Sequence, residues 1–499
     1  MQNPVMEAFM AKFEDEGLTF DDVSLVTAYA EFLPDDTDIR SRFTRELDLG
    51  IPFVSAAMDT VTEAEMAIAM ALLGGIGVIH KNLGPDEQAN EVGRVKHYLN
   101  GLIADPVTFP QNIRVSDLLR IREENEYQFA GFPIMDDNDR LVGILTSRDL
   151  RFLTDLDVPV SEVMTTELLT ATEGTSISEA FDIMTQHKVG KLPIVDDERT
   201  LVGLYSFSDV KAIIEKTGPN FNRDANHRLR VAAAVGPYDE KRFEALASQD
   251  VDAMVIDTSH GHSKGVVETV KFVKKHYPDI QVVAGNIATA EAATALLKAG
   301  ADAVKVGIGP GSICTTRVVA GVGVPQITAV YEVSRALDGA VPVIADGGVS
   351  YSGDAAKAIA AGADSVMMGS VLAGTEQSPG ETILHQGRTY VAYRGMGSMD
   401  ALKAGEGSRE RYNQASVLDA EKLVPQGIEG LIPYRGNVSD VLHQYAGGLR
   451  FSLGYCGAPS IPEFQRTARF VRISSAALRE AHPHDVKIIK DAPNYRSNS

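Results

Sequence analysis

A short apolar run leads directly into a glycine-rich turn in Ala303-Val304-Lys305-Val306-Gly307-Ile308-Gly309-Pro310-Gly311-Ser312-Ile313-Cys314-Thr315-Thr316-Arg317. The first four residues predict a buried strand. Glycines let the backbone approach a ligand closely, and successive amides in such a turn can form a concave anion site. Cys314 is a candidate nucleophile, provided that its thiolate is stabilised. A plain strand-to-helix turn holding a small buried cysteine explains this stretch alone equally well.

Seven other strand-like runs resemble the run that precedes this turn. They are Ile51–Ala56, Gly75–His80, Val231–Val235, Ala253–Asp257, Gln281–Ala284, Pro342–Ala345 and Ser365–Met368. Helix-like runs lie between them, among them Thr62–Leu73, Asp86–Lys96, Lys241–Ala247, Lys264–His276, Ala290–Lys298 and Gly353–Ala361. Eight strands alternating with helices predict an α/β protein with a (β/α)8 barrel, and an open doubly wound sheet is the alternative. In a barrel the strands end at one mouth, which is where we expect the chemistry.

The alternation is interrupted by an internal repeat. Phe132–Asp137 and Leu141–Asp149 recur about sixty residues later as Leu192–Asp197 and Leu201–Asp209. Each copy predicts two strands and the start of a helix capped by Thr146 or Ser206, after an amphipathic helix near 115–124 or 177–187. The repeat resembles a pair of CBS domains over roughly residues 105–216. That resemblance implies that Thr146 with Asp149, and Ser206 with Asp209, face the ribose and phosphates of ATP or GTP; helix capping is the plainer interpretation.

Bulk composition excludes several classes of protein. With 44% hydrophobic and 23% charged residues, the chain reads as soluble and globular, and its 499 residues call for more than one core. No apolar run reaches transmembrane length and no signal peptide is recognisable, so a cytoplasmic location is expected. The net charge of −21 argues against a general affinity for nucleic acid or anionic membranes. Two cysteines, Cys314 and Cys456, are too few for a disulfide framework or a zinc site, and Cys456 is interpreted as structural.

These patterns divide the chain into three parts. Residues 1–100 form the first part of the catalytic barrel, and residues 101–218 form the tandem module, with halves at about 101–160 and 161–218. Residues 219–499 complete the barrel. A polar, glycine-containing stretch at about 388–430 follows the eighth strand, and its length predicts a mobile flap over the mouth.

The whole chain resembles the IMP dehydrogenases of the IMP dehydrogenase / GMP reductase family. The motifs that carry the resemblance include Val54–Glu63, Gly74–Gly77, Ile256–Gly261, the Cys314 loop, Ile344–Gly348, Tyr393–Ser398, Ser408–Tyr412 and Glu480–Val486. The resemblance implies NAD-dependent oxidation of IMP to XMP, the committed step of guanine nucleotide biosynthesis. It implies that Cys314 attacks purine C2, that hydride passes to NAD, and that the flap then enters the vacated site for hydrolysis of the adduct.

For hydrolysis, the resemblance assigns the base to Arg411 beside Tyr412, and the positioning of water to Thr316. By residue type alone Arg411 reads as a surface charge, because guanidinium is normally protonated. Gln426 is a departure, since many bacterial relatives carry a glutamate there. A glutamine forms hydrogen bonds but cannot act as a base, which places more of the proton transfer on Arg411.

The remaining expected sites also come from the resemblance. The substrate-binding residues would be Ser312, Asp346, Gly348, Gly369, Ser370, Tyr393, Gly395, Met396, Gly397 and Gln426, with Asp346 on the ribose hydroxyls. Those for NAD would be Asp257, Gly307, Ile308 and Gly309. Potassium would lie on carbonyls of Gly309, Gly311 and Cys314, completed by Glu480, Ala481 and His482 of a neighbouring subunit in a homotetramer, with an octamer as the alternative.

Two other functions fit the sequence. A CBS-containing GMP reductase would share the barrel and the Cys314 loop, but has no water step and would not need the Arg411-Tyr412 flap. A nucleotide-sensing regulator without catalysis is disfavoured because Cys314, Thr316, Arg411 and Tyr412 are all present.

Overall fold

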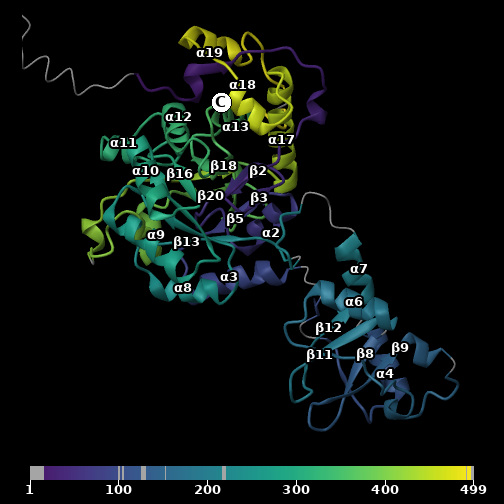
Figure 1. The fold of residues 1–499 in the computed structure, drawn as a ribbon. Helices are drawn as coiled ribbons and strands as arrows, with labels where there is room; N and C mark the ends of the chain where they lie inside the picture. The colour runs from purple at the N-terminus through teal and green to yellow at the C-terminus, as the bar shows by residue number, and fades with distance from the viewer. Residues whose placement is uncertain are drawn as a thin grey trace, which may run out of the picture. The chain divides into compact units, whose positions relative to one another are not determined.

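The computed structural model describes residues 16–98, 102–103, 106–124, 131–151, 153–215, 221–226, 228–417, 419–489 and 492–495, without the side chains of residues 209, 212 and 215. The chain forms two compact units, which separate between Lys96 and His97 and again near residues 219–229. The larger unit contains the barrel and the C-terminal segment, and the smaller contains the repeat (Figure 1). Each unit is described by itself.

Eight parallel strands close into a barrel, which confirms the predicted (β/α)8 fold. In chain order they are β4 (Phe53–Ser55), β5 (Ile76–Ile79), β13 (Ala232–Val235), β14 (Ala253–Asp257), β15 (Gln281–Ile287), β16 (Ala303–Val306), β17 (Val343–Asp346) and β18 (Ser365–Met368). Around the barrel the order is β13-β14-β15-β16-β17-β18-β4-β5, closed by the pairing of Ala232 with Val78. The open-sheet alternative is therefore wrong.

Helices surround the barrel and give it a core on both sides of the strands. They include α2 (Ala64–Leu72), α3 (Pro85–His97), α8 (Glu240–Ala247), α9 (Lys264–His276), α10 (Ala290–Ala299), α12 (Gln326–Leu337) and α13 (Ser352–Ala360), several of which are labelled in Figure 1. Residues on alternating sides of β14 are equally buried, as Met254 and Val255 show. Strands buried on both faces are apolar throughout, which explains why they read as short continuous runs.

The smaller unit repeats one arrangement twice. The first copy contains α4 (Val115–Glu124), β8 (Gly131–Met135), β9 (Leu141–Thr146) and α5 (Ser147–Leu150). The second contains α6 (Ile177–His187), β11 (Lys191–Val195), β12 (Leu201–Ser206) and α7 (Phe207–Glu215). In each copy the two long strands form an antiparallel pair with the same irregularity after the isoleucine, at Ile134 or Ile194. The repeat in the sequence is thus a repeat in the structure.

The segment after β18 is more regular than the sequence predicted. A three-stranded antiparallel sheet forms from β19 (Thr382–His385), β20 (Arg388–Arg394) and β21 (Glu429–Pro433). Two short helices, α15 (Met399–Ala404) and α16 (Glu406–Arg411), lie between β20 and β21. The long helix α17 (Val438–Tyr455) follows and packs on α13. We call residues 395–428, which connect β20 to β21, the flap; the sheet gives it a fixed base.

Within the described ranges, no helix combines the length and apolar character that spanning a membrane requires.

Candidate active site

A cavity of about 110 Å³ opens at the C-terminal mouth of the barrel. It is lined by Met58, Thr258, Ser259, Asn286, Gly307, Ile308, Gly309, Pro310, Gly311, Ile313, Cys314, Thr316, Asp346, Gly347, Tyr393, Gly395, Met396, Arg411, Tyr412 and Gln426. These residues come from the ends of the barrel strands and from the flap. All four predicted catalytic residues, and half of all the predicted site residues, therefore meet in one place, although they come from distant parts of the sequence.

The predicted nucleophile lies in a short hydrogen-bonded chain. Cys314 Sγ is 3.1 Å from Thr316 Oγ1, and that hydroxyl donates to Gln426 Oε1 at 3.0 Å. The amide of Cys314 donates to the carbonyl of Gly311, and Cys314 also forms a β-bridge with Gly427 of the flap. The loop that carries the cysteine is thus held from two sides, and its thiol is partly accessible.

The flap covers the opposite side of the mouth. Arg411, at the end of α16, forms an ion pair with Asp257 at the end of β14. Tyr412 follows it into the interior and packs against Gly397, where a Cβ would lie 2.6 Å from the tyrosine ring. Burial raises the pKa of the Tyr412 hydroxyl, while the nearby Arg411 charge opposes that rise. In this structure the flap is closed. Arg411 is paired with the carboxylate of Asp257, which the resemblance assigns to the binding of NAD.

Lys305 is the main polar residue of the site that the sequence interpretation missed. It points inward from β16 and is 1% exposed, yet it carries an ammonium group. Its ammonium lies 2.9 Å from Asp257 Oδ1 and 2.6 Å from Asp346 Oδ2, and it also donates to Asn286. The signal in the sequence was a lysine inside an otherwise apolar strand. A buried cation is stable only when it is paired, so this position already called for acidic partners.

Two of the residues predicted for the substrate phosphate, Ser312 and Gly369, lie next to Tyr393. The Tyr393 hydroxyl hydrogen-bonds to the side chain of Ser312, and burial raises its pKa. A Cβ on Gly369 would lie 3.1 Å from that hydroxyl, a tight contact, so the glycine leaves room beside the tyrosine. Ser370 begins the next helix, and Gly348 has a φ of +82° beside the ring of Phe20. Of these residues only Tyr393 lines the cavity itself.

The residues predicted to border the base lie between the Cys314 loop and the flap. Gly395, Met396 and Gln426 line the cavity. Gly397 supports the ring of Tyr412. The backbone of Gln426 accepts from Thr315 and donates to Gly397, which joins the nucleophile loop to the flap. Gly307, Ile308 and Gly309, predicted for NAD, line the cavity beside them, whereas Asp257 lies beneath it.

The residues predicted for potassium fall into two separate groups in this chain. Gly309, Gly311 and Cys314 lie in the nucleophile loop, where Gly309 has a φ of +76°. Glu480 and Ala481 end α19 (Ser475–Ala481), and His482 packs on Tyr351 and hydrogen-bonds to Tyr495. Among the described residues, no group of three or more His, Cys, Asp or Glu side chains is arranged to hold a metal ion. A carbonyl site in the loop uses other donors and stays a prediction.

In the smaller unit the predicted nucleotide residues hydrogen-bond to one another. Asp149 accepts the amide and the hydroxyl of Thr146, both at 2.7 Å, and also the hydroxyl of Thr165 at 2.9 Å. Ser206 Oγ lies 3.0 Å from Ser208 Oγ, and the side chain of Asp209 is outside the described part of the chain. The contacts of Thr146 are those of a helix cap.

A closed parallel barrel with a cysteine, paired acids and a covering flap at its C-terminal mouth defines a (β/α)8-barrel enzyme. The model of the IMP dehydrogenase / GMP reductase domain matches residues 17–484, so the chain belongs to that family.

Known relatives extend over nearly all of the chain. It is 52% identical to inosine-5′-monophosphate dehydrogenase of Halalkalibacterium halodurans, over 97% of this chain and 99% of that protein. It is 50% identical to inosine-5′-monophosphate dehydrogenase of Escherichia coli, over 98% of this chain and the full length of that protein. Among solved structures, a variant of the GMP reductase of Trypanosoma brucei in complex with guanosine 5′-monophosphate superposes with a TM-score of 0.79 and 36% identity, covering 96% of this chain and 100% of that one.

Proposed function

We propose that this chain is an NAD-dependent oxidoreductase that converts IMP to XMP in guanine nucleotide biosynthesis, through a covalent adduct on Cys314. Full-length similarity to inosine-5′-monophosphate dehydrogenases supports the reaction. The observation that carries the proposal is the closed flap, which places Arg411 and Tyr412 in the cavity that also holds Cys314.

The first half of the reaction forms and oxidises an adduct. The thiolate of Cys314 forms a bond to purine C2 of IMP, and the C2 hydrogen leaves as hydride to the nicotinamide of NAD. This step converts NAD to NADH and leaves XMP bound through sulfur. Addition of sulfur to the ring makes hydride loss easier, because it divides one difficult step into two. Tyr393 and Ser312, with Gly369 beside them, hold the phosphate, and Asp346 binds the ribose diol.

The cofactor and the closed flap exclude each other. Ligand sites for molecules of drug size measure roughly 300–1,000 Å³, whereas the cavity under the closed flap measures about 110 Å³. Asp257 is also occupied by Arg411. NAD therefore binds when the flap has moved away, and Asp257 then becomes free to accept the nicotinamide ribose hydroxyls. Lys305 lies beside both Asp257 and Asp346, and its charge limits the repulsion between the two acids.

The second half hydrolyses the adduct. After NADH leaves, the flap closes, and the guanidinium of Arg411 gives up one proton to solvent. The neutral guanidine then takes a proton from a water held by Thr316 and Tyr412. The resulting hydroxide adds to C2, and the thiolate of Cys314 leaves. The ion pair with Asp257 holds Arg411 in the site only when the flap is closed. Arg411 therefore reaches the water only after closure. Gln426 positions Thr316 through its carbonyl but accepts no proton as a base.

Three further parts complete the proposal. A monovalent cation, for which potassium is the expected ion, binds carbonyls of the nucleophile loop, together with Glu480, Ala481 and His482 of a neighbouring subunit in a homotetramer. The smaller unit, spanning about residues 101–218, is a tandem CBS module that binds ATP or GTP near Thr146 and Ser206. The enzyme acts in the cytoplasm.

The reaction is tested by incubating the purified full chain with IMP and NAD. We expect NADH and XMP in equal amounts, and after rapid quenching we expect a covalent adduct on Cys314 by mass spectrometry. NADPH-driven conversion of GMP without oxidation of IMP would instead assign the chain to the GMP reductases. Absence of both reactions would support a nucleotide-binding regulator.

A further inference from the structure

The loop His80-Lys81-Asn82, which follows β5, lies directly beneath the flap helix α16. Two glycines make this approach possible. A Cβ on Gly407 would lie 2.1 Å from the carbonyl oxygen of Lys81, and a Cβ on Gly405 would lie 2.2 Å from Asn82 Oδ1. Distances this short are not tolerated between real atoms, and in the first case the obstacle is backbone that cannot rotate away. The close approach of the helix to this loop therefore depends on the glycine at position 407, and Gly405 avoids a clash with the side chain of Asn82.

Polar contacts fix the position of the helix on the loop. Asn82 Oδ1 accepts the amide of Ser408 at 3.2 Å, and Asn82 Nδ2 donates to Asp59 Oδ2 at 2.7 Å. Asp59 in turn binds the guanidinium of Arg394, the last residue of β20. One asparagine thus connects the start of α16 to the strand from which the flap emerges.

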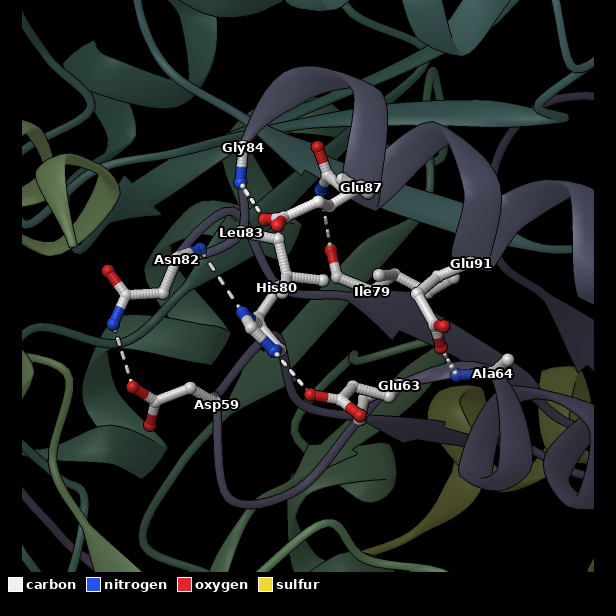
Figure 2. Close-up of polar contacts among 12 residues, drawn as sticks. Asp59, Glu63, Ala64, Ile79, His80, Asn82, Leu83, Gly84, Glu87 and Glu91 are labelled. Carbon is white, nitrogen blue, oxygen red and sulfur yellow. Dashed lines mark hydrogen bonds and ion pairs between the residues drawn. The ribbon is translucent and has the colours of Figure 1, made fainter. Parts of the chain in front are cut away.

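Figure 2 shows the polar contacts that hold the loop on the barrel. The ring of His80 is buried, with Nδ1 accepting the amide of Asn82 at 3.1 Å and Nε2 lying 3.3 Å from Glu63 Oε1. Acceptance at Nδ1 places the proton of a neutral ring on Nε2, facing the glutamate. Gln88 donates to the carbonyl of Ile79. Glu63 precedes α2 and Gln88 lies in α3, so these contacts tie the loop to the barrel and its helices.

The neighbouring strand ends hold the rest of α16. Glu410 Oε2 lies 3.6 Å from Lys81 Nζ, above Gly236 at the end of β13, where a Cβ would lie 2.6 Å from that carboxylate. The carbonyl of Arg411 accepts the amide of Ser259, after β14. Because β5, β13 and β14 are consecutive around the barrel, these contacts form one continuous surface, which we call the flap seat.

We infer that the flap seat, made by Lys81, Asn82 and Gly236 and matched by Gly405 and Gly407 of the flap, positions Arg411 for hydrolysis of the adduct and takes no part in hydride transfer. The residues of the seat are positioning residues, because they contact the helix and not the substrate. The inference rests on the proposed cysteine adduct and mobile flap. Its physical basis is that the last turn of α16 carries Arg411, so any displacement of the helix from the loop moves the guanidinium away from Asp257 and the water.

The test replaces Gly407 by alanine and follows the two half-reactions separately. Alanine is the better helix former, so Gly407→Ala favours the helix itself and harms only its docking. We expect the first turnover to release NADH at the wild-type rate and amplitude. The steady-state rate should fall roughly 10- to 100-fold, since displacements of about 1 Å at a catalytic group have effects of this size. The covalent adduct should accumulate. Asn82→Ala is expected to act in the same direction and more weakly.

The matched control is Gly430→Ala in β21, because a Cβ there meets nothing within 4 Å. It should leave both phases unchanged. An unchanged steady-state rate in Gly407→Ala would overturn the inference, and so would an equal loss of the NADH burst and the steady-state rate. Circular dichroism and thermal unfolding establish whether each variant is folded. If Gly407→Ala does not fold, Asn82→Ala provides the test. If the wild-type enzyme itself forms no adduct, the proposed mechanism fails, which is a different result from a failure of the seat.

Discussion

The ammonium of Lys305 lies 2.6 Å from the carboxylate of Asp346, at the ends of two adjacent barrel strands. The same ammonium contacts Asp257, so one buried cation holds two acids that the proposed mechanism assigns to different ligands. With the flap closed, Arg411 supplies a second positive charge to this group. Opening of the flap leaves a net negative charge, which suits the binding of hydroxyl groups and a cationic nicotinamide ring.

Lys305→Met is expected to destabilise the barrel and to weaken substrate binding. Removing one partner of a buried ion pair costs about 3–5 kcal/mol, because the remaining charges stay buried without compensation. Urea unfolding measures the loss. Lys298→Met, at an exposed position of α10, is the control and should change stability by no more than about 0.5 kcal/mol. Equal stability of the two variants would contradict the role given to Lys305.

Cys314→Ala is expected to abolish NADH formation from IMP, by at least about 10³-fold, because the adduct cannot form. The fold should survive, since the side chain contacts only Thr316 through a polar group. Stopped-flow absorbance follows NADH, and intact-mass spectrometry checks the adduct. Cys456→Ala removes the other thiol, which is buried and has its pKa raised by burial. Full activity in Cys314→Ala would show that the nucleophile is assigned wrongly.

Arg411→Ala is expected to separate the two half-reactions. In the proposed mechanism hydride transfer occurs with the flap open, so the first turnover of NADH should persist. Hydrolysis should slow by roughly 10²–10⁴, the usual contribution of a general base. Lys403→Ala on the exposed side of α15 is the control for a change of charge in the flap. A parallel loss of both phases would mean that Arg411 acts before hydrolysis.

Gln426→Glu is expected to restore part of the hydrolysis lost in Arg411→Ala. The side chain at this position already contacts Thr316, so a carboxylate there could accept a proton relayed through the hydroxyl. The double variant should therefore hydrolyse the adduct faster than Arg411→Ala, with a rate that rises as the new carboxyl ionises. Asn413→Asp, at an exposed position of the flap, tests whether added negative charge alone has this effect. No difference between the double and single variants would exclude the relay.

Lys81 predicts a pH dependence of stability. Burial lowers the pKa of its ammonium to about 8, against the opposing attraction of Glu410, while the nearby charges of Arg411 and Arg242 lower it further. The unfolded chain then binds more protons than the folded one between about pH 8 and 10, so this residue adds stability as pH rises through that window. In Lys81→Met the contribution should vanish. Thermal unfolding of the wild type and of Lys81→Met from pH 7 to 10 measures the difference in their stability at each pH. A difference that stays constant across this range would contradict the prediction.

The barrel was predictable because its signal is local. Each strand is a short apolar run, and β14, β16 and β18 begin and end at the residues that the sequence predicted. The segment after β18 was predicted less well. Strands β19 and β20 form a local hairpin, but β21 pairs with β20 across the whole flap, and that pairing depends on contacts between distant residues. Helix α17 has a weak pattern because Gly447 and Gly448 interrupt it, and its burial comes from packing on α13.

The sequence by itself determined the family, the order of strands and helices, and the chemical types around Cys314. Tertiary structure alone decided which of these residues meet: it paired Lys305 with Asp257 and Asp346, turned Arg411 into the cavity, and placed Gly407 against the carbonyl of Lys81. The physical reason is that a strand or helix is specified by neighbours a few residues apart. The charge balance of a buried site and the fit of a glycine against distant backbone exist only after the barrel has closed.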